Sequence, residues 1–334
     1  MSKIVCFGEI LIDLLAEPPA GPDAPRAFLQ YAGGAPANVA VAAARLGADT
    51  HFAGMLGEDM FGDFLLESLE SAGVATDCIV RTNQAKTALA FVALDADGER
   101  SFSFYRPPAA DLLFRAADFR DQTFSATTVF HVCSNSLTEP AIAETTLAGM
   151  ARARAAGAVV SLDLNLRPAL WPPGADPAPR LWQALEAADL VKLSREELEY
   201  LARPFGGQEA GEAQVRARLF AAKAQCVIIT AGAGTIHWYT PQASGQVGSF
   251  RVKTLDTTAA GDAFVGGLLV RLGERRGDGG GFADFCQDPR AIEDAIRFGA
   301  AVGALAVTRK GAFAAMPSHA EVMHLLQEQA AHAA

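Results

Sequence analysis

The chain has 334 residues, of which 50% are hydrophobic and 20% are charged, so it can bury a sizeable core and is not a disordered sequence. Its 28 basic and 38 acidic residues give a formal net charge of −10, which argues against nucleic acid or an anionic membrane as the main partner. The 5 cysteines are scattered without a C-x-x-C pair, as expected for free thiols in a reducing compartment.

No segment has the pattern of a signal peptide or of a membrane span. Residues 1–8 enter a predicted strand without the apolar run and small-residue cleavage site of a signal peptide. The Ala-rich stretch over residues 39–44 ends at Arg45 and is too short to cross a bilayer. We therefore expect a cytoplasmic protein.

The hydrophobic pattern alternates short apolar runs with longer segments of helical period. Strands are predicted over residues 4–7, 10–15, 50–55, 128–132, 159–162, 190–193 and 227–230. Helices are predicted over residues 36–46, 61–72, 139–156, 196–201, 260–272, 291–307 and 320–329. This alternation predicts an α/β fold with a mainly parallel sheet covered on both faces, within a single domain over residues 1–334. Proline and glycine predict exposed loops over residues 168–179 and 273–281.

One segment breaks the alternation of strands and helices. Residues 87–94 and 100–105 are two β-type runs joined by Asp95-Ala96-Asp97-Gly98, and Asp-Gly between such runs is typical of a hairpin. Since no helix separates the runs, we expect them to pair antiparallel. They predict a small flap beside the main sheet, built from about residues 10–32 and 86–108. The alternative is an antiparallel edge of the main sheet.

Several common catalytic signatures are absent from the sequence. It contains no G-x-x-x-x-G-K-[ST] P-loop, no G-x-G-x-x-G after the first strand, no G-x-S-x-G and no H-E-x-x-H. The 6 histidines form no metal-ligand pattern. The sequence therefore excludes a P-loop enzyme and argues against a dinucleotide-binding Rossmann site.

The strongest motif is Asp256-Thr257-Thr258-Ala259-Ala260-Gly261-Asp262, at the start of a predicted helix. With Thr257 or Thr258 as the N-cap, the N–H groups of residues 259–262 have no acceptor within the helix, and small side chains let an anion approach them. Asp262 stands in the first turn and could accept a proton from a hydroxyl group that attacks a bound phosphoryl group. The alternative is that Asp262 only complements the helix dipole.

A second motif, Gly33-Gly34-Ala35-Pro36-Ala37-Asn38, opens the first predicted helix. Paired glycines allow positive φ and close approach of a ligand, and Asn38 offers both a donor and an acceptor. Asp13 follows the first strand and could accept hydrogen bonds from vicinal hydroxyls. This set suits a polyol, although a tight turn and a capping role explain the residues individually.

Together these motifs resemble the PfkB (ribokinase-like) family of carbohydrate kinases over nearly the whole chain. Three further segments fit the family's order and spacing: Gly57-Glu58-Asp59-Met60-Phe61-Gly62, Asp163-Leu164-Asn165-Leu166-Arg167 and Lys192-Leu193-Ser194-Arg195-Glu196-Glu197-Leu198. Residues 33–38, Phe104-Tyr105-Arg106-Pro107 and residues 163–168 look most like bacterial fructokinases. The resemblance implies a three-layer α/β/α fold whose β-strand flap serves as a lid.

The resemblance also implies an ATP-dependent kinase that phosphorylates a sugar hydroxyl, with D-fructose phosphorylated at O6 as the first choice. Asp262 matches the catalytic base, beside an anion hole formed by Ala259, Ala260 and Gly261. The positions that match sugar-binding residues are Asp13, Gly33, Gly34, Asn38, Arg106, Asn165 and Arg167. Those that match the nucleotide site are Lys192, Glu197, Thr230, Gly232, Gly234, Lys310 and Gly311. Glu197 matches a position linked to Mg²⁺ through water, and Asp256 and Thr258 match a site for a monovalent cation such as K⁺.

The chain departs from the family pattern at Ala259, where glycine is usual, at Ser194, where asparagine is common, and at Ala301, which replaces a frequent asparagine. The Thr230 to Gly234 turn looks one residue shorter than the family's usual loop. The amides of the anion hole survive the first change, and Glu197 is retained beside the second.

Several alternatives remain open for the substrate and the function. Arg106 and Arg167 could pair with a carboxylate, so 2-keto-3-deoxygluconate is an alternative to fructose, as is ribose. Aromatic residues in the predicted flap, such as Phe104, leave a nucleoside kinase as an alternative function. A non-catalytic protein that senses a sugar or a nucleotide is a further alternative. A flap with unpaired edges predicts a homodimer.

Overall fold

The computed structural model describes residues 2–17, 21, 25, 27–94, 100–277 and 279–333, which form a nine-stranded and a four-stranded sheet. The order of the large sheet is β13-β12-β11-β10-β9-β8-β1-β4-β5. Its strands are β1 (Lys3–Phe7), β4 (Asp49–Gly57), β5 (Ala75–Thr82), β8 (Thr127–Cys133), β9 (Val159–Asp163), β10 (Leu190–Ser194), β11 (Cys226–Thr230), β12 (Ile236–Tyr239) and β13 (Ser244–Val247). The neighbouring strands from β11 through β10, β9, β8, β1 and β4 to β5 pair in parallel, and β12 and β13 add an antiparallel edge.

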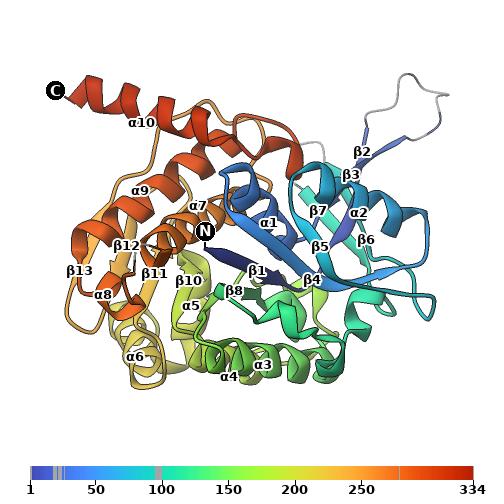
Figure 1. The fold of residues 1–334 in the computed structure, drawn as a ribbon, viewed down its shortest axis with the longest axis horizontal. Helices are drawn as coiled ribbons and strands as arrows, with labels where there is room; N and C mark the ends of the chain where they lie inside the picture. Colours follow the sequence, from blue (N-terminus) through green and yellow to red (C-terminus); the bar gives the residue numbers. More distant parts are fainter. Residues whose placement is uncertain are drawn as a thin grey trace.

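Helices cover both faces of this sheet (Figure 1). Alternate residues of β1 show the two layers, because Ile4 and Cys6 belong to one buried cluster whereas Val5 and Phe7 belong to the other. The first cluster includes side chains of α1 (Ala35–Arg45), α2 (Met60–Ser71), α7 (Ala260–Gly277), α8 (Phe282–Cys286), α9 (Pro289–Ala306) and α10 (His319–Ala333). The second includes side chains of α3 (Pro140–Ala155), α4 (Ala178–Ala187), α5 (Arg195–Ala202) and α6 (Gln208–Ala221). The predicted three-layer architecture is confirmed.

The four-stranded sheet is separate from the large sheet and lies beside its β4–β5 side (Figure 1). Its strands are β3 (Phe28–Gly33), β2 (Leu11–Ala16), β6 (Leu89–Leu94) and β7 (Arg100–Tyr105), in that order. β6 and β7 pair antiparallel, as predicted, whereas β2 and β6 pair in parallel. The predicted turn Asp95-Ala96-Asp97-Gly98 lies outside the described residues. We call these four strands the flap.

The structure differs from the sequence predictions in several elements. α7 continues to Gly277, where a loop was predicted from residue 273, and the ion pair between Arg271 and Glu274 one turn apart supports the extension. α6 was not predicted because it has few large apolar residues (Val215, Leu219 and Phe220), and β12 and β13 were missed because each has only 4 residues.

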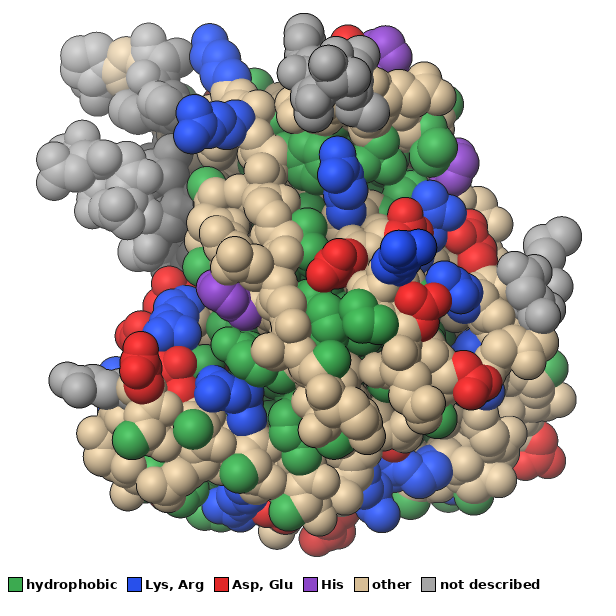
Figure 2. All heavy atoms as spheres, turned by 90° about the vertical axis from the view of Figure 1, so that its left-hand side faces the viewer, with side chains coloured by type: hydrophobic (Ala, Val, Ile, Leu, Met, Phe, Trp, Pro, Cys, Tyr) green, Lys and Arg blue, Asp and Glu red, His purple; other side chains and the backbone are tan. Residues whose placement is uncertain are grey.

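Side chains of both charges lie on the surface, although acidic residues outnumber basic ones by 38 to 28 in the sequence. Figure 2 shows acidic and basic side chains interspersed on one face, with hydrophobic side chains scattered between them. None of the described helices combines the length and the apolar character that a membrane crossing needs.

Candidate active site

Three segments that are distant in the sequence meet at Asp262, in the first turn of α7. The Asn38 Nδ2 group donates a hydrogen bond of 2.8 Å to Asp262 Oδ2, and Asn165 Nδ2 donates one of 2.9 Å to Oδ1. Close packing of α1 against α7 brings Asn38 into place, and a Cβ atom at Gly266 would lie 2.5 Å from Ala42 Cβ. The predicted base and two predicted sugar-site residues therefore form one cluster.

The Asp262 carboxyl group is poised to exchange a proton near neutral pH. Burial raises its pKa from 3.8 to about 7, although the hydrogen bond from Asn38 acts in the opposite direction. The negative charge of Asp163 adds to the rise, whereas the positive charges of Arg167 and Lys192 oppose it. A general base works best when its pKa lies close to the working pH, so this environment suits proton abstraction.

Several backbone N–H groups at the start of α7 have no hydrogen-bond acceptor within the helix. Ala259, with φ of 57°, precedes the helix, so neither Thr257 nor Thr258 occupies the position directly before its first residue. Among the described residues, no backbone hydrogen bond is found from the N–H groups of Ala259, Gly261 or Asp262. Open amides at a helix N-terminus bind anions, which agrees with the predicted anion hole.

A buried ammonium group stands beside these amides. A Cβ atom at Gly261 would lie 3.4 Å from Lys192 Nζ. Lys192 Nζ contacts Asp163 Oδ1 at 3.0 Å and Oδ2 at 3.1 Å, because the two residues pair directly in the register of β10 and β9. Burial alone would lower the pKa of Lys192, but the carboxylates of Asp163 and Glu197 raise it above its ordinary value. The lysine therefore stays charged at the anion hole.

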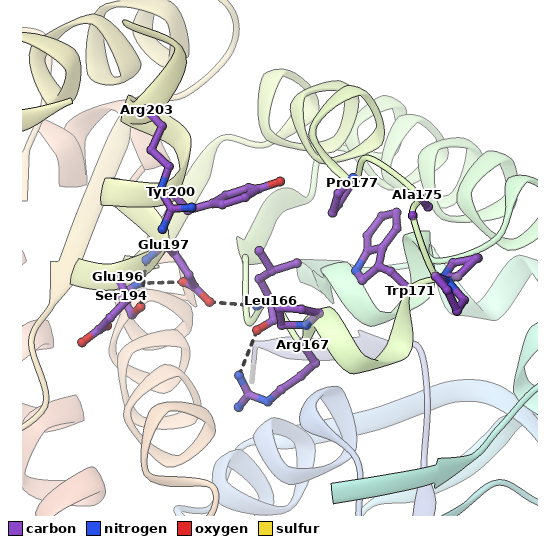
Figure 3. A pocket seen from close by; sticks show the side chains of 14 residues that line it. Leu166, Arg167, Trp171, Ala175, Pro177, Ser194, Glu196, Glu197, Tyr200 and Arg203 are labelled. Carbon is purple, nitrogen blue, oxygen red and sulfur yellow. Dashed lines mark hydrogen bonds between the residues drawn. The ribbon is translucent and has the colours of Figure 1, made fainter. Parts of the chain in front are cut away.

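Glu197 joins α5 to the loop that carries Asn165. Its Oε2 atom accepts the Ser194 N–H at 2.7 Å, its Oε1 atom accepts the Leu166 N–H at 2.8 Å, and Ser194 Oγ caps the helix by accepting the Glu197 N–H at 3.2 Å (Figure 3). Ser194, one of the departures noted in the sequence, thus serves as the helix cap. Burial raises the pKa of Glu197, and each of its oxygens holds a backbone N–H.

A cavity of about 540 Å³ runs from this anion hole toward α9. Predicted residues Lys192, Thr230, Gly232 and Gly261 line it. The remaining wall includes the apolar side chains Ile236, Phe250, Val252, Phe264, Ala300 and Val307. One end of the cavity thus carries a positive charge and free N–H groups, and the rest of it is apolar. This combination suits a ligand in which a phosphate chain is attached to a flat base.

Besides Glu197, three predicted nucleotide residues do not line that cavity. Lys310 is exposed, and Gly234 donates its N–H to Ala231 O within the turn. Gly311 donates its N–H to Asp256 Oδ2 at 3.1 Å. Asp256 Oδ1 accepts the Thr258 N–H at 2.8 Å. The two predicted cation-site residues are therefore hydrogen-bonded to each other in the segment that precedes α7.

The paired glycines lie where close approach requires them. A Cβ atom at Gly33 would lie 2.2 Å from Asp13 Oδ2, and one at Gly34, where φ is 108°, would lie 2.6 Å from Glu9 O. Sequence reasoning missed Glu9, whose Oε1 atom accepts the Ala35 N–H at 3.0 Å and the Asn135 Nδ2 group at 2.9 Å. The sequence signal for Glu9 was an acidic residue that follows β1 after a single glycine.

The two predicted arginines have different environments. Arg106 is 1% exposed, and its Nε and Nη2 atoms donate to Asp111 Oδ2 at 2.9 and 2.6 Å. Arg167 is exposed, and its Nη1 atom donates to Leu166 O at 3.3 Å. Arg106 therefore already has a buried carboxylate partner, which sequence reasoning did not anticipate.

A second, open cavity of about 680 Å³ lies on the other side of Ser194, which lines both cavities. Figure 3 shows Trp171 and Tyr200 in its wall and the Arg167 side chain directed away from them. Glu197 also lines this cavity, beside Ser194 and Leu166.

Comparison with known proteins identifies the family. A model of the pfkB family carbohydrate kinases matches residues 1–319. The chain belongs to this family. A fructokinase-1 of Oryza sativa subsp. japonica is 40% identical over 332 residues, which cover 97% of this chain and 97% of that protein. The predicted family membership is confirmed.

Solved structures agree with this assignment to the pfkB family. A fructokinase of Xylella fastidiosa with bound ATP has a TM-score of 0.92 and 58% identity, over 98% of this chain and 99% of that one. A double mutant of the Vibrio cholerae O395 fructokinase in a fructose-, ADP- and potassium-bound form has a TM-score of 0.81 and 34% identity, over 97% and 98%. The chain is thus a sugar kinase by family.

Proposed function

We propose that this protein is an ATP-dependent fructokinase that transfers the γ-phosphoryl group of ATP to O6 of D-fructose. The observation that carries the proposal is the Asp262 carboxylate, held by Asn38 and Asn165 beside the open amides of α7 and the Lys192 ammonium group. Fructokinases from a plant and two bacteria, at 34–58% identity over nearly the whole chain, support fructose as the acceptor.

The geometry suggests a role for each group in an in-line transfer. The sugar hydroxyl gives its proton to Asp262 while its oxygen forms a bond to the γ-phosphorus, and the bond from that phosphorus to the bridging oxygen of ADP breaks. The amides of α7 and Lys192 offset the charge on the transferred group. Asp13 and Asn38 hold the sugar, and closure of the flap excludes water.

We infer that metal ions assist this site. When bound with ATP, Mg²⁺ would neutralise charge on the phosphate oxygens, and the carboxylate of Glu197 would accept hydrogen bonds from the water ligands of the ion. The loop formed by Asp256 and Thr258 is our candidate for a monovalent-cation site, since the Vibrio cholerae relative was crystallised in a potassium-bound form.

We propose a neutral sugar rather than an acidic one. Arg106 is paired with Asp111 inside the protein, so a sugar carboxylate would have to compete for it with a buried ion pair. This favours fructose or ribose over 2-keto-3-deoxygluconate. A nucleoside remains the second candidate class, because an aminoimidazole riboside kinase of Salmonella enterica has a TM-score of 0.79 at 29% identity.

A sugar panel tests the proposal. We expect ATP consumption, measured by coupling ADP formation to NADH oxidation, to be at least tenfold higher in kcat/KM for D-fructose than for ribose, 2-keto-3-deoxygluconate or a purine riboside. A higher value for any of these would reassign the substrate within the kinase class. No sugar-dependent ADP formation at all would favour a non-catalytic sensor.

The pH dependence of the reaction follows from Asp262. Because the base must be ionised and burial raises its pKa to about 7, we expect kcat/KM to rise about tenfold per pH unit below pH 7 and to level off above it. Initial rates at constant ionic strength over pH 5.5–9 measure this. A flat profile across pH 6–8 would argue against Asp262 as the base.

We further propose that two copies associate through their flaps. Phe28, Leu29 and Tyr105 on the flap are 43%, 44% and 65% exposed, and association would cover them. The cysteines are all free and buried, which supports a reducing compartment such as the cytoplasm.

A further inference from the structure

The beginnings of β4 and β5 carry a polar cluster that the proposed kinase chemistry does not use. His51, Asp77 and Cys78 bring an imidazole nitrogen, a carboxylate oxygen and a thiol sulfur within 4.8 Å of one another. The cluster lies near the amino ends of parallel strands, whereas Asp163 and the kinase site lie at their carboxyl ends. Nitrogen, sulfur and oxygen donors together are typical of a zinc site.

An irregular strand pairing gathers these three side chains. His51 pairs with Ala75 but Ala53 pairs with Cys78, so β5 contains one more residue than β4 over this interval. Consecutive residues of a regular strand point to opposite faces, and a bulge re-aims one of them. The extra residue thus lets neighbouring Asp77 and Cys78 both approach His51.

Both ring nitrogens of His51 face carboxylates. Nδ1 lies 2.7 Å from Asp77 Oδ1, and Nε2 lies 3.3 Å from Asp49 Oδ1. A histidine that binds a metal through one nitrogen usually donates the N–H of the other to a carboxylate. Asp49 occupies that supporting position, which leaves Nδ1 for a metal ion shared with Asp77.

The other two donors are supported in the same way. Gln122 Nε2 donates to Asp77 Oδ2 at 2.9 Å, which directs Oδ1 toward His51, and Thr123 Oγ1 donates to Cys78 Sγ at 3.5 Å. Each of the three donor groups therefore has its own hydrogen-bonding partner. The Asp77 side chain is 43% exposed, so an ion can enter from solvent.

We propose that His51 Nδ1, Asp77 Oδ1 and Cys78 Sγ form a binding site for one Zn²⁺ ion, with a water molecule as the fourth ligand. An imidazole nitrogen and a thiol sulfur among the donors select against Mg²⁺ and Ca²⁺, which prefer sites with several oxygen ligands.

Cobalt substitution tests the site, because a Co²⁺–thiolate bond gives a near-ultraviolet charge-transfer band. Untagged protein without nucleotide should take up one equivalent of Co²⁺ with this band, and Zn²⁺ should abolish it. Cys78→Ser should remove the band, whereas Cys286→Ser, at another buried free thiol, should keep it. Absence of the band, or its persistence in Cys78→Ser, would overturn the proposal.

The supporting carboxylate provides a second readout. Asp49→Asn should keep the Co²⁺ band but weaken Zn²⁺ binding by about 10–100-fold in competition with a chromophoric chelator. Unchanged Zn²⁺ affinity would mean that Asp49 and His51 form only a surface ion pair. All these variants should keep the sugar-dependent ATP turnover of the unmodified chain, since none touches the kinase site, and this activity shows that they fold.

Discussion

Asp262→Asn should lower kcat by about 10²–10⁴-fold, because the substituted amide cannot accept the proton of the attacking hydroxyl. Stopped assays with fructose and ATP measure the loss. Asp294→Asn, at an exposed carboxylate on α9, is the matched control and should retain full activity. Near-normal turnover in Asp262→Asn with intact folding would show that another group takes the proton.

The same substitution should stabilise the folded protein at pH 8. Burial raises the pKa of Asp262 from 3.8 to about 7, so its contribution to stability is complete below pH 4 and is lost as the pH rises through 7. Above pH 7 the wild-type protein buries an ionised carboxylate, and the variant avoids this cost of about 1–3 kcal/mol. Urea titrations at pH 8 and pH 5 measure the free energy of unfolding of both proteins. The difference between the wild-type protein and the variant should be larger at pH 8 than at pH 5. An equal difference at both pH values would contradict this account.

Lys192→Met should have the second large effect, on both stability and catalysis. The substitution leaves Asp163 buried without its ammonium partner, which costs about 3–5 kcal/mol in the free energy of unfolding. It also removes positive charge from the anion hole, so kcat should fall by about 10²–10³-fold. Arg275→Met, at an exposed ion pair with Asp288, is the control and should change stability by about 1 kcal/mol or less.

A double variant separates the two roles of Lys192. Lys192→Met/Asp163→Asn removes the uncompensated carboxylate and should recover most of the lost stability in the same urea titration. Its kcat should nevertheless stay low, because no cation stands beside Gly261. If the double variant regained wild-type turnover, Lys192 would be a structural residue and not part of the anion hole.

The sequence predicted the parts of the fold that local pattern determines. Strands such as β1 and β11 are continuous apolar runs, and the start of α7 follows from small residues before a helical period. The Asp262 cluster was also predictable, because Asn38 and Asn165 occupy motifs at a helix start and directly after a strand.

Other features depend on tertiary partners that no local pattern shows. Arg106 looks like an exposed ligand residue in the sequence, yet Asp111 and Thr138 hold it inside the protein. Glu9 is a buried carboxylate whose role depends on Asn135, which is 126 residues away. These contacts form because the ends of different strands meet at one edge of the sheet. Sequence reasoning identified only those site residues that belong to a recognisable motif.

The most direct test of the central claim is a crystal structure of Asp262→Asn with ATP and fructose. We expect the γ-phosphate to accept hydrogen bonds from the amides of Gly261 and residue 262 and to lie near Lys192, with fructose O6 between the phosphorus and the side chain at position 262. ATP bound with its phosphates in the cavity beside Trp171 and Tyr200, or fructose bound away from Asn38, would contradict the account.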